Sequence, residues 1–174
     1  MMRYLASMVG LLVVLLAPPA HAQMTMADLQ IAVRALSFME HPLSGTVRLG
    51  IIYVSGDEAS IRQADNVARL LGSGLKVGNL TITPVRVPVD QAGTAPIDLF
   101  FLPEGIGNQA LPVSAASRKR KLTCITLDIK QVENGTCVLG VQSLPKVRIY
   151  VNRAASNASN ASFVTVFLMM VTEV

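Results

Sequence analysis

The chain has 174 residues, a formal net charge of +4 and a composition that is 51% hydrophobic but only 5% aromatic, with no tryptophan. This aliphatic-rich composition predicts a globular chain and excludes an intrinsically disordered one. The length suits one domain with one sizeable core. The modest charge gives no general signal for binding nucleic acid.

The first 22 residues have the features of a secretory signal peptide. A single basic residue, Arg3, precedes an apolar run over 5–17, which ends at Pro18-Pro19 and the small-residue triplet Ala20-His21-Ala22. This order predicts cleavage after Ala22, which leaves 23–174 as a single mature domain in an oxidising compartment outside the cytoplasm. A membrane anchor is the alternative, but a spanning helix needs roughly 20 apolar residues and this run is shorter.

The pattern of apolar residues predicts a helix, a strand, a helix and an irregular strand over 25–40, 47–54, 55–72 and 80–89. Thr25 and Asp28 resemble a capping box at the start of the first helix. The first strand is almost wholly apolar, which is typical of a strand buried on both faces of a parallel sheet. Pro84 and Pro88 should place the second strand at an edge or make it irregular.

The second half of the chain continues the alternation, with a helix over 108–119 and strands over 98–102, 122–129, 138–142 and 147–151. The last two strands should form an antiparallel hairpin. The apolar segment 163–171 is too short to span a membrane, and its composition fits a helix or a strand. The sequence predicts a single three-layer α/β domain of flavodoxin-like character, a mostly parallel sheet with a C-terminal antiparallel hairpin.

Cys124 and Cys137 are the two cysteines of the chain. An even count in an exported chain predicts a disulfide, which would close a short loop and contribute about 3 kcal/mol by the chain-entropy estimate. Asn134-Gly135 is a strong turn signal, so the bridge should hold the mouth of a turn to the end of a strand. A metal pair or a redox pair is the alternative, although the sequence has no C-x-x-C and the only mature histidine is His41.

No catalytic, cofactor or metal motif stands out in the sequence. It lacks G-x-S-x-G, H-E-x-x-H and the P-loop, and His41 stands before Pro42 in a turn that ends a helix. We therefore expect neither an enzyme nor a cofactor or metal site. The basic run over 118–121 can mark a nucleic-acid or anionic-lipid patch, but a solvated helix end is the more common explanation.

Five residues are candidates for binding a ligand or partner. In an open parallel sheet, ligands collect beyond the carboxyl ends of the strands at the switch point. The turn with Gly56 and Asp57 and the loop with Glu104, Gly105 and Gly107 follow two predicted strands. The two acidic side chains would act as acceptors, and the backbone amides of the second loop could face an anion. Helix capping and turn formation are the alternative roles.

Five segments, in this order, resemble the YfiR family of small periplasmic proteins: LQIAVRALSFMEHP, VRLGIIYVSGD, DLFFLPEG, KLTCITLDI and KVRIYVNRAASNASNASF. The last segment matches best, with a strand that ends at Val151-Asn152, an Ala-rich stretch and a short apolar helix. The chain departs from the family pattern in two places. Its first helix lacks the usual aromatic-rich ending, and the segment 164–171 is more β-branched.

The resemblance implies a periplasmic regulator that binds and represses the periplasmic domain of an inner-membrane diguanylate cyclase, an enzyme of cyclic-di-GMP signalling. It also implies a supporting disulfide, and Cys124 and Cys137 stand where that bridge is expected. The alternative is a single-lobe small-molecule binding protein related to solute-binding components of transport. The chain has the length for one lobe of such a receptor, and a homodimer is compatible with both functions.

Overall fold

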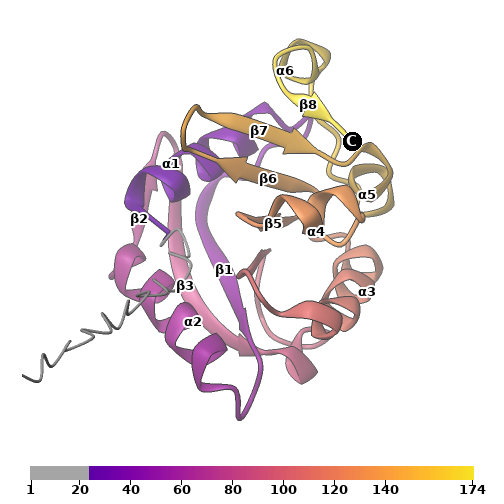
Figure 1. Cartoon of the computed structure of the whole chain (residues 1–174). Coiled ribbons are helices and arrows are strands. Elements are labelled where there is room, and N and C mark those ends of the chain that lie inside the picture. Colours follow the sequence, from indigo (N-terminus) through magenta and orange to yellow (C-terminus); the bar gives the residue numbers. More distant parts are fainter. Residues whose placement is uncertain (1–23) are drawn as a thin grey trace, which may run out of the picture.

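Eight strands form one mixed sheet with helices on both faces (Figure 1). This computed structural model describes residues 24–174, and the predicted signal peptide over 1–22 lies outside them. In sheet order the strands are β2 (Leu75–Val77), β3 (Leu80–Pro88), β1 (Gly45–Tyr53), β4 (Leu99–Leu102), β5 (Cys124–Thr126), β6 (Leu139–Gln142), β7 (Arg148–Val151) and β8 (Thr172–Glu173).

The central five strands, β3-β1-β4-β5-β6, are all parallel. β2 runs antiparallel to β3, and β7 runs antiparallel to β6, which confirms the predicted C-terminal hairpin. After β1 the chain crosses outward to β3 and then returns to β4 on the other side of β1. The strand order therefore reverses between β1 and β4, as it does at the switch point of a flavodoxin-like sheet. The predicted fold class is confirmed.

The helices of the described chain are α1 (Met26–Ala35), α2 (Glu58–Leu71), α3 (Ala110–Arg120), α4 (Ile129–Glu133), α5 (Arg153–Ala158) and α6 (Thr165–Leu168), with 3-10 turns η1 (Leu36–Phe38), η2 (Val89–Gln91) and η3 (Gly107–Gln109). Thr25 and Asp28 form the predicted capping box at the start of α1. Gly72 follows α2 at φ 55°, a backbone angle that glycine tolerates best.

Two apolar clusters cover the two faces of the sheet. Alternate residues of β1 divide between them, so that Leu49 and Ile51 pack with α1 and α2 while Ile52 packs with α3. All three side chains are fully buried. This confirms the prediction that the first strand is buried on both faces, as expected in a parallel sheet.

β3 pairs with β1 along its whole length despite its two prolines. On its outer side β3 pairs only through Leu80, Thr81 and Ile82, with the short strand β2. Pro84 and Pro88 lie beyond this contact. There β3 has no outer neighbour, so a proline, which lacks an amide donor, interrupts no sheet hydrogen bond on that side. The prediction that this strand lies at a sheet edge therefore holds for the half of β3 that contains the two prolines. The short strand β2 was not predicted.

The C-terminal apolar segment over 163–171 forms the short helix α6, and the strand β8 comes directly after the segment. Phe163 bridges to Met39, α6 follows, and β8 pairs in parallel with β7. The ring of Phe167 stacks on that of Phe38, with centroids 4.9 Å apart. Within residues 24–174, none of the helices has the length and apolarity that a membrane crossing requires.

Candidate functional site

An open groove of about 620 Å³, which we call the edge groove, lies at the carboxyl ends of the parallel strands. Its walls come from the segments that follow β1, β4 and β5 and from the last residue of β6. The lining residues are Asp57, Ala59, Ser60, Gln63, Glu104, Gly105, Leu127, Asp128, Ile129, Lys130 and Gln142. The groove therefore occupies the position at which a switch point favours ligand binding.

Asp57 is both a wall residue of the edge groove and the N-cap of α2. Its Oδ1 accepts hydrogen bonds from the backbone amides of Ala59 and Ser60, at 2.9 and 3.1 Å. The buried Ser60 hydroxyl accepts a further bond from the amide of Val54, at 2.9 Å. These bonds fix the turn after β1. The structure thus shows the helix-capping role of Asp57 that the sequence analysis left as an alternative. The second carboxylate oxygen of Asp57, Oδ2, makes no hydrogen bond within residues 24–174.

The loop after β4 contributes Glu104 and Gly105 to the same groove as Asp57, so the fold brings these three predicted residues together. The predicted residues Gly56 and Gly107 do not line the groove. Both have positive φ angles, 81° and 56°, and they allow the chain to turn on either side of it.

Sequence reasoning missed the groove residues Asp128 and Lys130, because it expected a strand over 122–129. The observed strand β5 stops at Thr126, and Asp128 caps the short helix α4 by accepting a bond from the Lys130 amide at 3.1 Å. A usable signal was present, since Asp128 is followed three residues later by Gln131, which is a capping-box pattern.

α4 is held against the loop after β4 by buried polar side chains. Thr126 Oγ1 lies 2.8 Å from the carbonyl oxygen of Leu102 and 3.0 Å from Gln131 Oε1. Gln131 Nε2 donates to the carbonyl of Pro103, at 3.0 Å. This network ties the α4 side of the edge groove to its Glu104 side.

Gly140 lets α4 pack closely on β6. A Cβ atom at this position would come within 2.5 Å of Val132 Cγ2 and 3.1 Å of Ile129 Cδ1. A larger residue at this position would force the Val132 and Ile129 side chains, or the helix that carries them, to shift. The groove residues on α4 therefore depend on a glycine in the neighbouring strand.

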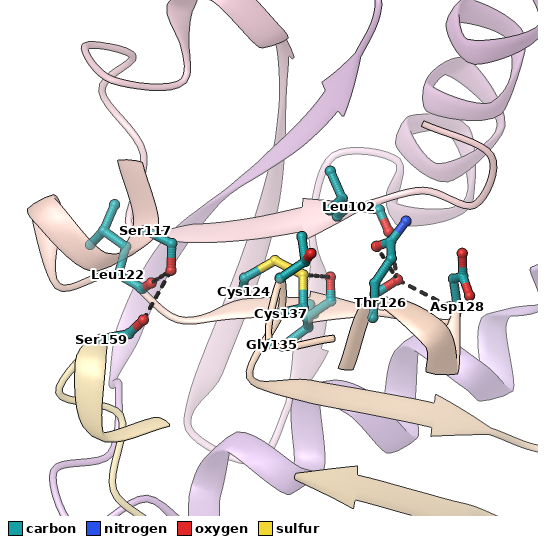
Figure 2. Close-up of a disulfide and its surroundings, with 12 residues drawn as sticks. Leu102, Ser117, Leu122, Cys124, Thr126, Asp128, Gly135, Cys137 and Ser159 are labelled. Atoms are coloured by element: carbon teal, nitrogen blue, oxygen red, sulfur yellow. Dashed lines mark hydrogen bonds between the residues drawn. A yellow bond between two sulfur atoms is a disulfide. The ribbon is translucent and has the colours of Figure 1, made fainter. Parts of the chain in front are cut away.

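The Cys124–Cys137 disulfide closes the base of the β5–α4–β6 crossover and confirms the predicted bridge (Figure 2). Both cysteines are fully buried in the apolar cluster on the α3 face. The bridge joins the start of β5 to the residue before Val138, whose amide donates to the Cys124 carbonyl at 3.0 Å. The predicted turn at Asn134-Gly135 is present, but it follows the unpredicted helix α4, so the bridge spans a whole crossover.

A second open groove, the helix groove, adjoins the first along α2 and has a volume of about 660 Å³. It shares Gln63, Glu104 and Leu127 with the edge groove. Its remaining lining is mainly apolar and consists of Met24, Val67, Leu70, Phe101 and Pro103. Asn66 and Arg69 add two polar side chains. The two grooves therefore adjoin along Gln63, Glu104 and Leu127.

The predicted basic run is not simply a solvated helix end. Arg118 donates to the Gly135 carbonyl at 2.9 Å, and Lys121 donates to the Ala158 carbonyl at 2.9 Å. Arg120 donates to three carbonyls in the segment 92–97. These cations join the end of α3 to three other segments of the fold.

No protein-family model matches the sequence, and no curated protein matches it either. Two solved structures share the fold. The ligand-free, open structure of CD0873, a substrate binding protein with adhesive properties from Clostridium difficile, superposes with a TM-score of 0.59 at 13% identity and covers 84% of this chain. A conserved domain protein from Vibrio cholerae gives a TM-score of 0.59 at 8% identity over 85% of this chain. This chain spans 59% of the length of each, and the likeness shows the fold alone.

Proposed function

We propose that the chain is a single-lobe periplasmic binding protein that takes up a small molecule in the edge groove. The groove carries this proposal, because segments from four parallel strands converge on it at the switch point between β1 and β4. The structural likeness to a substrate binding protein supports it. A disulfide and the predicted leader support an extracytoplasmic site of action.

In this proposal the protein binds its ligand and does not transform it. Ser60 contributes the only hydroxyl among the described residues that line the edge groove, and it already accepts a hydrogen bond from the Val54 amide. Asp57 and Asp128 are held in place as helix caps. Such fixed acceptors suit recognition of a ligand, since they need no rearrangement on binding.

Blocking the groove tests this function. Ala59 is exposed and lines the edge groove, so Ala59→Trp should fill it without disturbing the core. Ala115 is equally exposed but lies on α3, and Ala115→Trp is the matched control. We expect at least one compound in a library of amines, amino acids, sugars and carboxylates to raise the melting temperature of the mature protein. Ala59→Trp should abolish that shift and Ala115→Trp should keep it.

Two results would contradict binding at the edge groove. One is the absence of any stabilising compound in the library. The other is an equal response of the two tryptophan variants, which would place the binding site elsewhere on the protein.

A second function, which we propose as the alternative, is repression of an inner-membrane signalling protein of the diguanylate cyclase type through contact in the periplasm. An exposed apolar surface at the C-terminal end favours it, because single exposed apolar residues are common but a group of them often marks a contact site. Val166, Met169 and Met170 are 65%, 79% and 65% exposed in and just after α6.

Cellular cyclic-di-GMP tests the alternative. Deletion of the gene should raise the level, and the wild-type chain should restore it. Val166→Lys with Met169→Lys should fail to restore it, whereas Leu111→Lys, at an exposed apolar residue of α3, should succeed. A level that does not respond to deletion would exclude this function.

A further inference from the structure

The loop that joins β6 to β7 presents apolar side chains to solvent. Gln142 pairs with Arg148 across the two strands, so residues 143–147 form the loop. Leu144 and Val147 are 73% and 57% exposed, although leucine and valine are usually buried. Neither of them lines the edge groove or the helix groove. In Figure 1 this loop lies at the end of the hairpin away from α5. We call residues 143–148 the hairpin tip.

Two cations stand among the apolar residues of the hairpin tip. Lys146 and Arg148 are both exposed, and neither makes a hydrogen bond or an ion pair within the described residues. The sequence has no Asp or Glu between Glu133 and Glu173, and Glu173 is paired with Arg153. The carboxylates of the edge groove come from the segments after β1, β4 and β5, not from this hairpin. The hairpin tip is therefore both apolar and positively charged.

This combination of groups favours an anionic lipid surface over a second copy of the chain. In a symmetric dimer the same patch meets itself, so Lys146 and Arg148 would approach the same two cations of the other copy. A bilayer accepts both kinds of group, because apolar side chains enter it while the cations stay beside the lipid phosphates. A protruding tip with two apolar side chains is also much smaller than the apolar core of a stable protein interface.

We propose that the hairpin tip docks the protein on the surface of an anionic membrane. Leu144 and Val147 enter the boundary between the headgroups and the acyl chains, and Lys146 and Arg148 contact lipid phosphates. The predicted export of the chain would bring it to such a surface. This role goes beyond both functions proposed above, because it requires neither a ligand in the edge groove nor a protein bound at α6.

Co-sedimentation with lipid vesicles tests the docking of the mature protein. Vesicles of phosphatidylcholine alone are compared with vesicles that contain equal parts of phosphatidylcholine and phosphatidylglycerol. We expect about tenfold tighter binding to the anionic vesicles, since each cation near an anionic membrane strengthens binding by roughly fivefold. High salt should remove this difference, because it screens the charges.

Matched charge variants separate the hairpin tip from the general positive charge of the chain. Lys146→Gln with Arg148→Gln should weaken binding to the anionic vesicles by about tenfold. Lys76→Gln with Lys119→Gln removes the same charge from two exposed residues, one on β2 and one on α3. This control should weaken binding by no more than about twofold, because its cations lie away from the membrane. The melting temperature of each variant confirms that it is folded.

A tryptophan at the hairpin tip reports its insertion, because the chain has no tryptophan of its own. The fluorescence of Leu144→Trp should shift to the blue when anionic vesicles are added, and brominated lipids should quench it. Leu111→Trp is the control, at a residue of α3 that is 66% exposed, and it should show neither change.

Three kinds of result would overturn the proposal. Failure to bind anionic vesicles excludes membrane docking. An equal loss of binding in the two glutamine pairs, or vesicle binding that leaves the Leu144→Trp fluorescence unchanged, places the contact elsewhere. A blue shift that grows with protein concentration in the absence of vesicles shows that a second copy covers the tip. None of these results affects the melting-temperature test of the edge groove, so the two proposals stand or fall separately.

Discussion

Arg120 stands at the last residue of α3, where its guanidinium donates to the carbonyl oxygens of Ala92, Ala95 and Ile97 at 2.8, 2.8 and 3.2 Å. Its charged group also lies 5.7 Å from the centroid of the Phe100 ring. A planar guanidinium has five N–H donors in a fixed fork, so one side chain can satisfy several carbonyls at once. Arg120 thereby holds the segment between β3 and β4 against α3.

We predict that Arg120→Lys lowers the free energy of unfolding by about 1–3 kcal/mol, because a lysine ammonium cannot reach three carbonyls in this arrangement. Urea unfolding followed by circular dichroism measures the loss. Lys119→Ala is the control, since Lys119 is exposed and makes no hydrogen bond within the described residues. An equal effect of the two substitutions would show that the carbonyl contacts contribute nothing.

Arg48 and Asp98 form a second long-range link, between β1 and the residue before β4. Arg48 donates from its backbone amide and from Nε to Asp98 Oδ2, and from Nη2 to Oδ1 at 2.8 Å. The hydrogen bonds from Arg48 lower the pKa of the Asp98 carboxyl below its ordinary 3.8. The Arg48 pKa rises, chiefly through the same hydrogen bond.

A lowered folded-state pKa means that the Asp98 carboxylate stabilises the fold above 3.8 and loses that effect as pH falls through its folded-state pKa. We predict that Asp98→Asn is less stable than the wild type at pH 7. The difference should shrink as pH falls below 3.8 and vanish once the wild-type carboxyl is protonated. Urea unfolding at several pH values measures this. A difference that stays constant down to acidic pH would contradict the prediction.

Local features of single residues could be predicted from the sequence, whereas distant partners could not. The capping roles of Thr25 and Asp57 depend on residues two or three positions away, which the sequence displays. The partners of Arg120 lie 23 to 28 positions away. Only the fold brings these partners to α3. From the sequence alone, Arg120 therefore looked like part of a solvated basic run, although it links α3 to a distant segment.

At the scale of elements, the position of α4 depends on Gly140 in β6. We predict that Gly140→Ala lowers the free energy of unfolding by about 1–3 kcal/mol, because the new methyl group overlaps Val132. It should also weaken ligand binding, since Asp128 and Lys130 move with the helix. Gly93→Ala, where a Cβ atom meets nothing within 4 Å, is the control. Chemical denaturation measures the first effect, and the rise in melting temperature with a stabilising compound measures the second. Unchanged stability would show that α4 adjusts freely.

The disulfide constrains the same crossover from its base. We predict that replacing both cysteines by alanine lowers the free energy of unfolding by about 3 kcal/mol, the chain-entropy value for a short loop. Urea unfolding of the double variant measures it. Because both cysteines are 0% exposed, dithiothreitol should reduce the bridge only when denaturant is present. Rapid alkylation of the cysteines in the native protein under reducing conditions would contradict this burial.

Long apolar elements were predictable, and short ones were not. The almost wholly apolar run of β1 and the helical spacing of α1 and α2 identify those elements without any knowledge of the fold. β2 and β8 have three and two residues, too few to show a period. α4 has five residues and is placed by Gly140 and the Gln131 network, which act between strands. Asp57, Glu104 and Gly105 could therefore be expected to lie near one another, but the α4 wall of the edge groove was missing from the prediction.

At the scale of the whole molecule, one sheet holds all the strands of residues 24–174, and these residues form no second lobe that could close over a ligand. We predict a radius of gyration of about 15 Å for the monomeric mature chain. The value should stay unchanged on adding a compound that stabilises the wild type but not Ala59→Trp. Small-angle X-ray scattering measures both values. A decrease on adding that compound would reveal a closing motion that the described fold does not provide, and a larger value that rises with protein concentration would reveal a homodimer.

The open form of the edge groove also has a kinetic consequence. A ligand that stays partly in contact with water can enter and leave without waiting for a lid or hinge, so association should approach the diffusion limit and the residence time should be short. Occupancy would then follow the periplasmic concentration of the ligand almost instantly. Such a protein would report a changing concentration faithfully, but it would hold too little ligand for too short a time to serve as a store.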